Sequence, residues 1–354
     1  MPDNPIGHFF FVIMEEFLAL FREKKRILIA PLDWGLGHAT RMYALAQILE
    51  NQGHIVFFAS SGLAYTWLNE KYPKTQIFKI SSYNVKFSGF WGITFSLLIS
   101  YFKFKKTIQK ENEEMTTIVT QNQIDTIISD HRYGVYHSNT FNIFVCHQLH
   151  LLVPKYLRIF SFIANKIHHK LIEKFQLCIV PDFQDHRLAG KLSKVNHFPI
   201  PKLYIGALSR FQFYPNNLQK DLEVPDVFAW ISGPEPHRKN LELKLIEKLK
   251  KIKGKHLICT GIIENEPQKI ITQNSEINIL PNISDHLFFE YIKNSKILIC
   301  RSGYTSIMDL YVCNRKAILL PTTGQTEQEY LAEYHKNNHT IVKEKDFDGF
   351  EIEW

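Results

Sequence analysis

Two separate sets of residues in this 354-residue chain have the types and spacing of a chemical site. The first is a glycine-rich turn that follows Asp33 and presents His38 at the start of a predicted helix. A free imidazole titrates at about 6.5, so it can accept a proton at neutral pH. The helix N-terminus beside it disfavours the charged ring and keeps it neutral. His38 is therefore the predicted general base, with Asp33 and Asp130 as its substitutes or orienting partners.

The second set follows two short apolar runs, 297–300 and 317–320, which predict buried parallel strands. A polar turn and helical spacing follow each run, so both turns lie at the same edge of the predicted sheet. Open α/β sheets bind ligands at that edge, and helix N-termini there favour anions such as a diphosphate. A single such turn is compatible with an ordinary helix cap, but two in series favour a binding site. Its predicted residues are Arg301, Ser302, Gly303, Asp309, Thr323, Gly324, Gln325 and Gln328.

These residues are positioned by a repeated strand–turn–helix pattern, which predicts an α/β chain. In the first half, apolar runs predict strands at 26–32, 54–60, 125–129, 142–146 and 175–180, and helical spacing predicts a helix at 39–52. In the second half, further strands are predicted at 227–232, 256–260 and 277–280. The turn before the first helix is not a dinucleotide fingerprint, because its third position is Thr40 and no acid ends the next strand.

The composition suits two domains with sizeable cores, since 45% of the residues are hydrophobic. A formal charge of +7 fits a surface that meets phosphates or anionic lipid head groups. Nucleic acid is not an expected partner, because no zinc-finger, basic-helix or RNA-binding signature is present. The five cysteines are odd in number and lie mostly in apolar runs, which indicates reduced, buried thiols and a cytoplasmic location.

The segment 88–110 is the predicted membrane-contacting element. Its first part, 88–102, is uncharged and apolar but shorter than the roughly 20 residues that span a bilayer. Phe and Trp followed by four lysines are typical of an interfacial element on anionic lipid, which would place the protein peripherally on the inner face of the membrane. A core helix whose end is solvated by the lysines is an equal alternative.

Metal binding is not predicted. Cys146, His147 and His150 are close in sequence, but no second ligand pair at zinc spacing accompanies them. His168 and His169 belong to a lysine-rich predicted helix and are expected to be solvated.

Three stretches of the sequence resemble the GT-B nucleotide-sugar glycosyltransferases. CRSGYTSIMDL at 300–310 and LPTTGQTEQEYLAE at 320–333 are similar to the donor-binding half, and ILIAPLDWGLGHATR at 27–41 is similar to the Gly-His turn of the other half. Within that family, the stretches resemble the peptidoglycan lipid II N-acetylglucosaminyltransferases, which have a family 28-like C-terminal domain. The resemblance implies the GT-B fold, with two Rossmann-like, doubly wound parallel-sheet domains that face a cleft. The expected division is an N-terminal extension at 1–25, an acceptor-binding domain at 26–206, a donor-binding domain at 207–335 and a C-terminal tail at 336–354.

The resemblance also implies roles for individual residues. Asp309 stands where the family has an acid that helps to hold the nucleotide sugar, and Glu329 stands beside Gln328 where the family has a second amide. Gly233 falls in the loop that corresponds to the family's phosphate loop. The expected acceptor-side residues are Trp34, Gly35, Gly37, His147 and Gln148.

The implied reaction is the inverting, metal-independent transfer of a sugar from a nucleotide diphosphate, expected to be UDP, to a hydroxyl. The expected acceptor is a lipid or a cell-envelope glycan, and no cofactor is expected besides the nucleotide sugar. Two other interpretations stay open: a sugar-nucleotide hydrolase or epimerase of the same fold, and a non-catalytic protein that binds nucleotide sugars.

Overall fold

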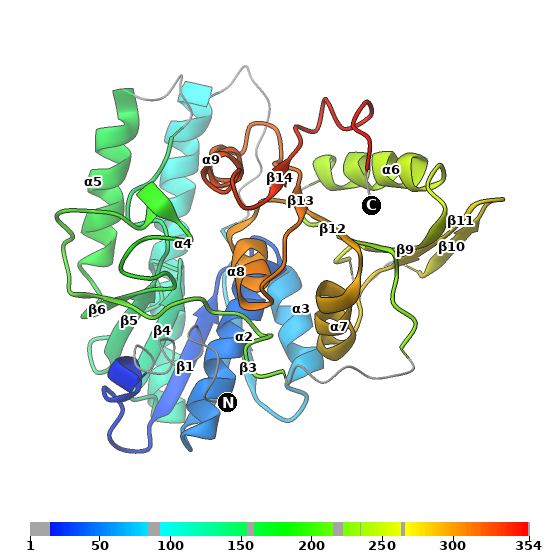
Figure 1. Ribbon diagram of the computed structural model, residues 1–354. Coiled ribbons are helices and arrows are strands. Elements are labelled where there is room, and N and C mark those ends of the chain that lie inside the picture. The colour runs from blue at the N-terminus through cyan, green and yellow to red at the C-terminus, as the bar shows by residue number, and fades with distance from the viewer. Residues whose placement is uncertain are drawn as a thin grey trace. The chain divides into compact units, whose positions relative to one another are not determined.

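A computed structural model of the protein describes residues 15–83, 93–153, 159–214, 222–233, 235–262 and 266–352, with 93–102 described by their backbone alone. The chain divides into two compact units, whose elements are labelled in Figure 1. The first unit comprises 1–151, 160–187 and 191–206, and the second comprises 152–159, 188–190 and 207–354. Each unit is built around its own sheet.

The first unit contains a seven-stranded sheet in which all hydrogen-bonded neighbours run parallel. The order β3-β2-β1-β4-β5-β6-β7 means that the chain starts in the middle and builds outward to each edge in turn. At the carboxyl ends of β1 and β4, Pro31 pairs with Asp130. The strands are β1 (Arg26–Pro31), β2 (Ile55–Ser60), β3 (Ile77–Lys79), β4 (Thr126–Asp130), β5 (Phe141–Val145), β6 (Leu177–Val180) and β7 (Lys202–Tyr204).

The helices that connect these strands bury apolar faces. They are α2 (Leu36–Asn51), α3 (Gly62–Lys71), α4 (Ile93–Asn122) and α5 (Ser161–Ile172). A core cluster joins Leu28 of β1, Ile127 of β4 and Met115 of α4. The strands are almost continuously apolar because a parallel sheet is covered by helices on both faces.

The second unit contains another seven-stranded sheet, ordered β10-β11-β9-β8-β12-β13-β14. Its neighbours are parallel except β10 and β11, which pair antiparallel at one edge. The strands are β8 (Val227–Trp230), β9 (Gly254–Cys259), β10 (Gln268–Ile271), β11 (Ser275–Leu280), β12 (Ile297–Cys300), β13 (Ile318–Leu319) and β14 (Thr340–Ile341). The helices are α6 (His237–Leu249), α7 (Asp285–Asn294), α8 (Tyr304–Val312) and α9 (Thr326–Tyr334).

The segment 336–354, expected to be a tail, contributes to the second sheet and its core. Strand β14 pairs with β13, and Val342 and Phe347 are buried in the same cluster as Ile299 and Ile318. The apolar residues of this segment are too few and too irregularly spaced to indicate a strand without the neighbouring β13. The second unit therefore extends well beyond residue 335.

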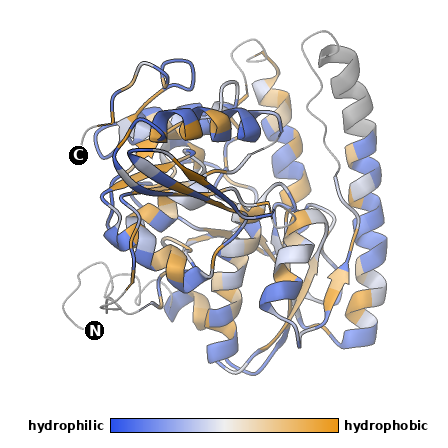
Figure 2. Ribbon diagram, turned by 90° about the vertical axis from the view of Figure 1, so that its right-hand side faces the viewer, coloured by the Kyte–Doolittle hydropathy of each residue, from blue (hydrophilic) through white to orange (hydrophobic). Residues whose placement is uncertain are grey.

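Helix α4 overlaps the predicted membrane-contacting segment. No helix in the described part of the chain is long and apolar enough to cross a membrane. The turns of α4 that follow its grey end are mostly blue in Figure 2, and Lys103, Lys105 and Lys106 are exposed on them. Residues 88–92 lie outside the described residues and the side chains of 93–102 are not described, so the membrane prediction stays a prediction.

Candidate active site

The turn between β1 and α2 fixes the position of His38. Gly35 precedes the helix with a φ of 86°, a left-handed conformation that glycine adopts without strain. A Cβ at this position would meet nothing within 4 Å, so the backbone angle rather than crowding favours glycine. Helix α2 then begins at Leu36, with Gly37 and His38 in its first turn. Trp34, which precedes this turn, is 49% exposed.

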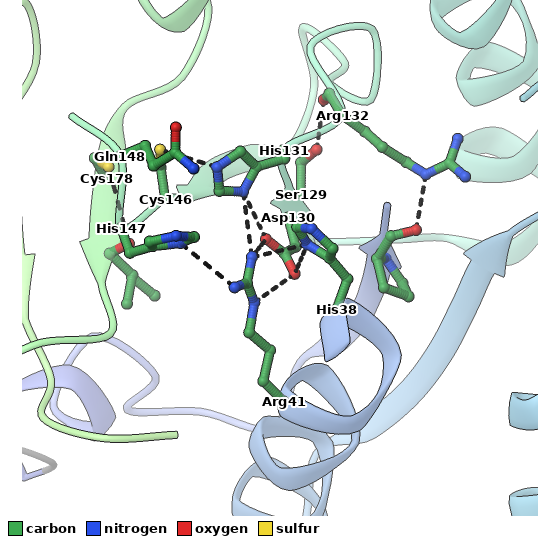
Figure 3. A network of polar contacts seen from close by, with 12 residues as sticks. His38, Arg41, Ser129, Asp130, His131, Arg132, Cys146, His147, Gln148 and Cys178 are labelled. Atoms are coloured by element: carbon green, nitrogen blue, oxygen red, sulfur yellow. Dashed lines mark hydrogen bonds and ion pairs between the residues drawn. The ribbon is translucent and has the colours of Figure 1, made fainter. Parts of the chain in front are cut away.

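His38 and Asp130 form a hydrogen-bonded pair where β1 and β4 end (Figure 3). Imidazole Nδ1 lies 2.9 Å from carboxylate Oδ2; the carboxylate is fully buried, whereas the imidazole is 17% exposed. Burial is the main cause that lowers the pKa of His38 to about 4, against the opposing effect of the Asp130 charge. The ring is therefore neutral at physiological pH, and the carboxylate can orient it as a general base.

Arg41, to which the sequence analysis gave no role, completes this pair. It follows His38 by three residues on α2, so both side chains leave the same face of the helix. Its Nε lies 2.8 Å from Asp130 Oδ2, and its Nη2 contacts Asp130 Oδ1 and lies 2.8 Å from His38 Nδ1. Burial would raise the pKa of Asp130, but Arg41 and His38 outweigh it and hold that pKa well below its usual range. The carboxylate is therefore ionised at physiological pH.

Two further imidazoles join the network in Figure 3. His131 Nδ1 lies 3.0 Å from Asp130 Oδ1 and 3.2 Å from Arg41 Nη2, while its Nε2 lies 3.3 Å from the Cys146 thiol. His147 is 3% exposed, and its Nδ1 lies 3.5 Å from Arg41 Nη1. The structure therefore brings the predicted residue His147 into the network of His38, together with His131, which was not predicted. The signal for His131 was its place directly after a strand that ends in a carboxylate.

The backbone of Gln148 contacts His168. Its carbonyl oxygen lies 3.0 Å from His168 Nε2, and the hydroxyl of Tyr133 lies 2.8 Å from Nδ1 of the same ring. His168 is only 2% exposed, so the expectation that it is solvated is wrong. It lies on the inner face of α5, whereas the lysines of that helix lie on its outer face. His169 is half-buried, with Nε2 3.1 Å from the carbonyl oxygen of Leu149.

Asp33 belongs to a second polar network. Its Oδ2 accepts hydrogen bonds from the hydroxyls of Ser61 and Ser82, at 2.8 and 2.5 Å. Its Oδ1 lies 3.5 Å from Nη2 of Arg132, a buried residue that also donates to the carbonyl oxygen of Pro31. Asp33 and Asp130 were both predicted to serve His38. Among the described residues, the contacts connect Asp130 to the His38 imidazole and do not connect Asp33 to it. Asp33 therefore shapes the turn that carries His38.

One set of described residues has the ligand types and spacing for a metal ion: His38, Asp130 and His131, with candidate atoms within 4.8 Å of one another. The guanidinium of Arg41 lies against all three side chains. A cation there would face a fixed positive charge and compete for a carboxylate that is already paired in the bidentate geometry that guanidinium favours. The donor set therefore fits Arg41 better than a metal ion.

In the second unit, the predicted donor-site residue Arg301 is buried, with 1% of its surface exposed. Its Nη2 donates to the carbonyl oxygen of His237 at 3.0 Å, and its Nη1 donates to that of Leu320 at 3.2 Å. Glu344 faces the same guanidinium at 3.3 and 3.4 Å. These contacts hold the two Nη atoms of Arg301 inside the domain, and its predicted place in the donor site stays a prediction. The side chain ties β12 to the start of α6 and to the segment after β14.

The turn between β12 and α8 carries Ser302 and Gly303. The Ser302 hydroxyl donates to the carbonyl oxygen of Gln328 at 2.8 Å, which joins this turn to α9. Gly303 is the N-cap residue of α8, and a Cβ there would meet nothing within 4 Å, so the backbone is open to a ligand. Asp309 follows on α8, is 5% exposed and accepts a hydrogen bond of 2.6 Å from Ser209. Burial raises the pKa of Asp309 to about 6.

The loop between β13 and α9 is held in shape by its own side chains. Gln328 Oε1 accepts a hydrogen bond of 2.9 Å from the Thr322 amide, and its Nε2 donates to Gln325 Oε1 at 2.6 Å. Glu329 Oε1 accepts from the Gly324 amide at 2.9 Å. The predicted pair Gln328 and Glu329 therefore organises the loop. The predicted residues of the loop that are exposed at its tip are Thr323 and Gly324.

Gly233 lies in the loop after β8 and has a φ of 123°. A Cβ there would lie 3.9 Å from the hydroxyl oxygen of Thr322, so two of the predicted donor-binding loops are neighbours. An open depression of about 400 Å³ is lined by His237, Asn240, Leu243, Lys244, Thr323, Glu344 and Lys345. Thr323 is the one predicted donor residue in that lining, so the depression alone is not the predicted nucleotide site.

Comparisons with known proteins agree with this architecture. Residues 239–352 match the model of the glycosyltransferase family 28 C-terminal domain. An uncharacterized glycosyltransferase of Methanosarcina acetivorans is 23% identical over 345 residues, which cover 91% of this chain and 84% of that protein. An uncharacterized glycosyltransferase of Methanosarcina mazei is 23% identical over 337 residues, with the same coverage.

Solved structures show the same fold. The glycotransferase of kitacinnamycin gives a TM-score of 0.60 at 11% identity, over 91% of this chain and 86% of that one. Arabidopsis thaliana UGT89C1, complexed with UDP-L-rhamnose, gives a TM-score of 0.57 at 12% identity, over 91% and 86% of the two chains. The predicted fold class and the predicted family resemblance are therefore confirmed. The chain is a glycosyltransferase with the GT-B fold, and its residues 239–352 match the glycosyltransferase family 28 C-terminal domain.

Proposed function

We propose that this glycosyltransferase is inverting and metal-independent, and that it transfers a sugar from a UDP-linked donor to a hydroxyl. The observation that carries the proposal is the contact of 2.9 Å between His38 Nδ1 and Asp130 Oδ2 at the start of α2. When Nδ1 donates to the carboxylate, Nε2 keeps a lone pair and can take a proton.

In the proposed step, His38 Nε2 takes the proton of the acceptor hydroxyl while that oxygen attacks the anomeric carbon. The bond from this carbon to the diphosphate oxygen breaks on the opposite face, so the configuration inverts and UDP leaves. Asp130 stabilises the imidazolium that forms, as the carboxylate does in other His–Asp pairs.

The second unit supplies the proposed donor site. The N-termini of α8 and α9 present the positive ends of their helix dipoles, which favour a diphosphate, and a Cβ on Gly303 or Gly324 would meet nothing within 4 Å. Asp309 is proposed to accept hydrogen bonds from ribose hydroxyls. UDP is proposed as the nucleotide because one structure of the same fold is complexed with UDP-L-rhamnose.

Metal independence is proposed because Arg41 supplies a positive charge beside His38, Asp130 and His131, the residues that could otherwise bind a metal ion. Arg41 pairs with Asp130 there, and helix N-termini in the other unit can stabilise the leaving diphosphate. No cofactor besides the nucleotide sugar enters the proposed step.

The proposed acceptor is a lipid or a cell-envelope glycan at the inner face of the membrane. Its support is the sequence of 88–102 and the exposed lysines that follow it on α4. All five cysteines are buried thiols, which fits a reducing, cytoplasmic environment.

A panel of nucleotide sugars tests the proposal. UDP-sugars are expected to raise the melting temperature because they bind the folded state, and transfer to an added acceptor is expected to continue in EDTA. Turnover of the UDP-sugar without any acceptor would instead indicate a hydrolase or an epimerase. Loss of transfer in EDTA that a divalent cation restores would contradict metal independence.

A further inference from the structure

Two imidazoles flank one guanidinium and one carboxylate in the first unit (Figure 3). His38 Nδ1 lies 2.9 Å from Asp130 and 2.8 Å from Arg41 Nη2. His131 Nδ1 has the same two neighbours, at 3.0 and 3.2 Å. The Nδ1 atom of each ring therefore faces both a hydrogen-bond acceptor, Asp130, and a hydrogen-bond donor, Arg41. A protonated Nδ1 donates to Asp130, and an unprotonated Nδ1 accepts from Arg41.

The hydrogens available to this group restrict the combinations. Arg41 Nη2 carries two hydrogens, and one of them is directed to Asp130 Oδ1. The other can be accepted by His38 Nδ1 or by His131 Nδ1, whichever is unprotonated. The remaining ring must then carry a proton on Nδ1 and donate it to the carboxylate.

Two arrangements result, with opposite consequences for the base. In the first, His38 donates from Nδ1 to Asp130 and keeps a lone pair on Nε2, while His131 accepts from Arg41 and is protonated on Nε2. In the second, His131 donates to Asp130 and His38 accepts from Arg41, so His38 Nε2 carries a hydrogen and has no lone pair with which to take the proton of the acceptor hydroxyl.

The surroundings of His131 accommodate either arrangement. Its Nε2 lies 3.3 Å from the Cys146 sulfur, and a thiol can both donate and accept a hydrogen bond. The ring is half-buried and has a backbone φ of 58°, a left-handed conformation that holds it against Asp130. Its position is thus fixed while its tautomer is free to change.

We propose that His131 is a positioning residue whose tautomer decides, through Arg41 and Asp130, whether His38 can act as the base. In the working state His131 accepts from Arg41 and His38 donates to Asp130. This inference rests on the proposed function for its catalytic meaning, but the coupling between the two rings can be measured without any transfer assay.

The direct test is ¹⁵N NMR of the full chain labelled in its histidines, with the His38 and His131 signals assigned from variants. The ring nitrogens report which of them carries the proton. The expected result is His38 protonated on Nδ1 and His131 protonated on Nε2. Two rings in the same tautomer, or the reverse assignment, would overturn the proposal.

A matched pair of variants tests the direction of the coupling. His131→Asn keeps an acceptor near Arg41 and suits the left-handed backbone, so His38 is expected to stay protonated on Nδ1. His131→Phe removes the acceptor, so Arg41 is expected to donate to His38 and move its proton to Nε2. Transfer by the Phe variant should fall by about 10² or more, toward the level of His38→Ala, with UDP affinity unchanged.

Removing the guanidinium should reverse that loss. In the double variant His131→Phe, Arg41→Met, no donor remains beside His38, so its proton is expected to return to Nδ1 and transfer to recover in part. Thermal melts and UDP binding confirm that each variant is folded. A His38 ring that stays protonated on Nδ1 in folded His131→Phe would overturn the coupling. If the tautomers change as expected but transfer does not, the coupling stands and the assignment of His38 as base fails.

Discussion

The proposed base, His38, is neutral because the effect of burial on its pKa outweighs that of the carboxylate beside it. An isolated His–Asp pair raises the pKa of the imidazole, since the negative charge favours the imidazolium. Here Arg41 pairs with the same carboxylate and cancels much of that effect, so burial dominates and the pKa of His38 falls to about 4. The ring therefore stays available for a proton across the physiological range.

The first prediction concerns the pH dependence of transfer. His38 acts in its neutral form, and its lowered pKa means that this form persists until the pH falls toward about 4. With the nucleotide sugar saturating, kcat/KM for the acceptor is expected to be constant between about pH 7.5 and pH 5.5. If the pKa of His38 were unshifted, kcat/KM would fall below about pH 6.5. Stopped assays across this range, with circular dichroism to confirm folding, provide the measurement. A tenfold loss per pH unit that begins near pH 6.5 would show that His38 is not the buried base described here.

Asp309 provides a second prediction, because its pKa is raised to about 6 by burial. In the proposed donor site its carboxylate accepts hydrogen bonds from ribose hydroxyls, and protonation weakens it as an acceptor. Uridine is therefore expected to bind about tenfold more weakly at pH 5 than at pH 7.5. Below the pKa of Asp309, each unit of pH decrease weakens binding by about 1.4 kcal/mol. Uridine is the suitable probe because it has no phosphate that titrates in this range.

The matched control for Asp309 is Asp309→Asn, which cannot titrate. It should bind uridine roughly tenfold to a hundredfold more weakly at pH 7.5, since hydrogen bonds to a charged group contribute about 1.5 to 3 kcal/mol each. Its affinity should not change between the two pH values. Calorimetry that finds the same pH dependence in both proteins would remove Asp309 from the ribose site.

Some residues of the candidate site could be predicted from the sequence, and the orientation of others could not. His38 and Asp130 could be predicted because Asp130 ends β4 and His38 starts the helix after β1, at the edge of a parallel sheet where side chains converge. Arg41 could have been found from its spacing on the same helix face. The orientation of Arg301 could not be predicted, because its partner Glu344 is distant in sequence and lies in a segment expected to be a tail.

At the level of elements, the start of α2 depends on one backbone angle. Gly35 and Gly303 are both N-cap residues, and a Cβ on either would meet nothing within 4 Å. They differ in φ, which is 86° at Gly35 and −71° at Gly303. This difference makes them a matched pair for a test of left-handed strain.

Gly35→Ala is expected to lower the free energy of unfolding by about 1 to 2 kcal/mol, because an L-residue is strained at positive φ. Gly303→Ala should change it by less than about 0.5 kcal/mol, because the lower entropy of the unfolded chain offsets a poorer helix cap. Urea denaturation of both variants is the measurement. Equal effects at the two positions would mean that the backbone angle does not determine how α2 starts.

The buried apolar strands could be predicted from sequence, and the partly exposed edge strands could not. Strand β12 spans the predicted residues 297–300, and β1, β2, β4 and β5 lie within a residue or two of their predicted bounds. Strands β3, β10 and β14, which were not predicted, lie at sheet edges and have 3, 4 and 2 residues. Their residues are mostly not buried and show no continuous apolar run, so pairing with a neighbouring strand decides whether they form.

In the molecule as a whole, each unit repeats one architecture and carries a different part of the proposed chemistry. Both sheets begin at a central strand, β1 or β8, and build outward in both directions. In the first unit the proposed base follows β1 and its carboxylate ends β4, and in the second unit the proposed donor residues follow β12 and β13. Loss of the base should therefore separate transfer from donor binding.

The measurement that tests this account most directly is single-turnover transfer by His38→Ala, paired with UDP binding to the same variant. General base catalysis contributes typically about 10² to 10⁴ in rate, so transfer should fall by an amount in that range while UDP affinity stays within about twofold of the wild type. Normal transfer by the variant would contradict the assignment of His38 as the base. Loss of both transfer and UDP binding would show that His38 supports the fold instead of the chemistry.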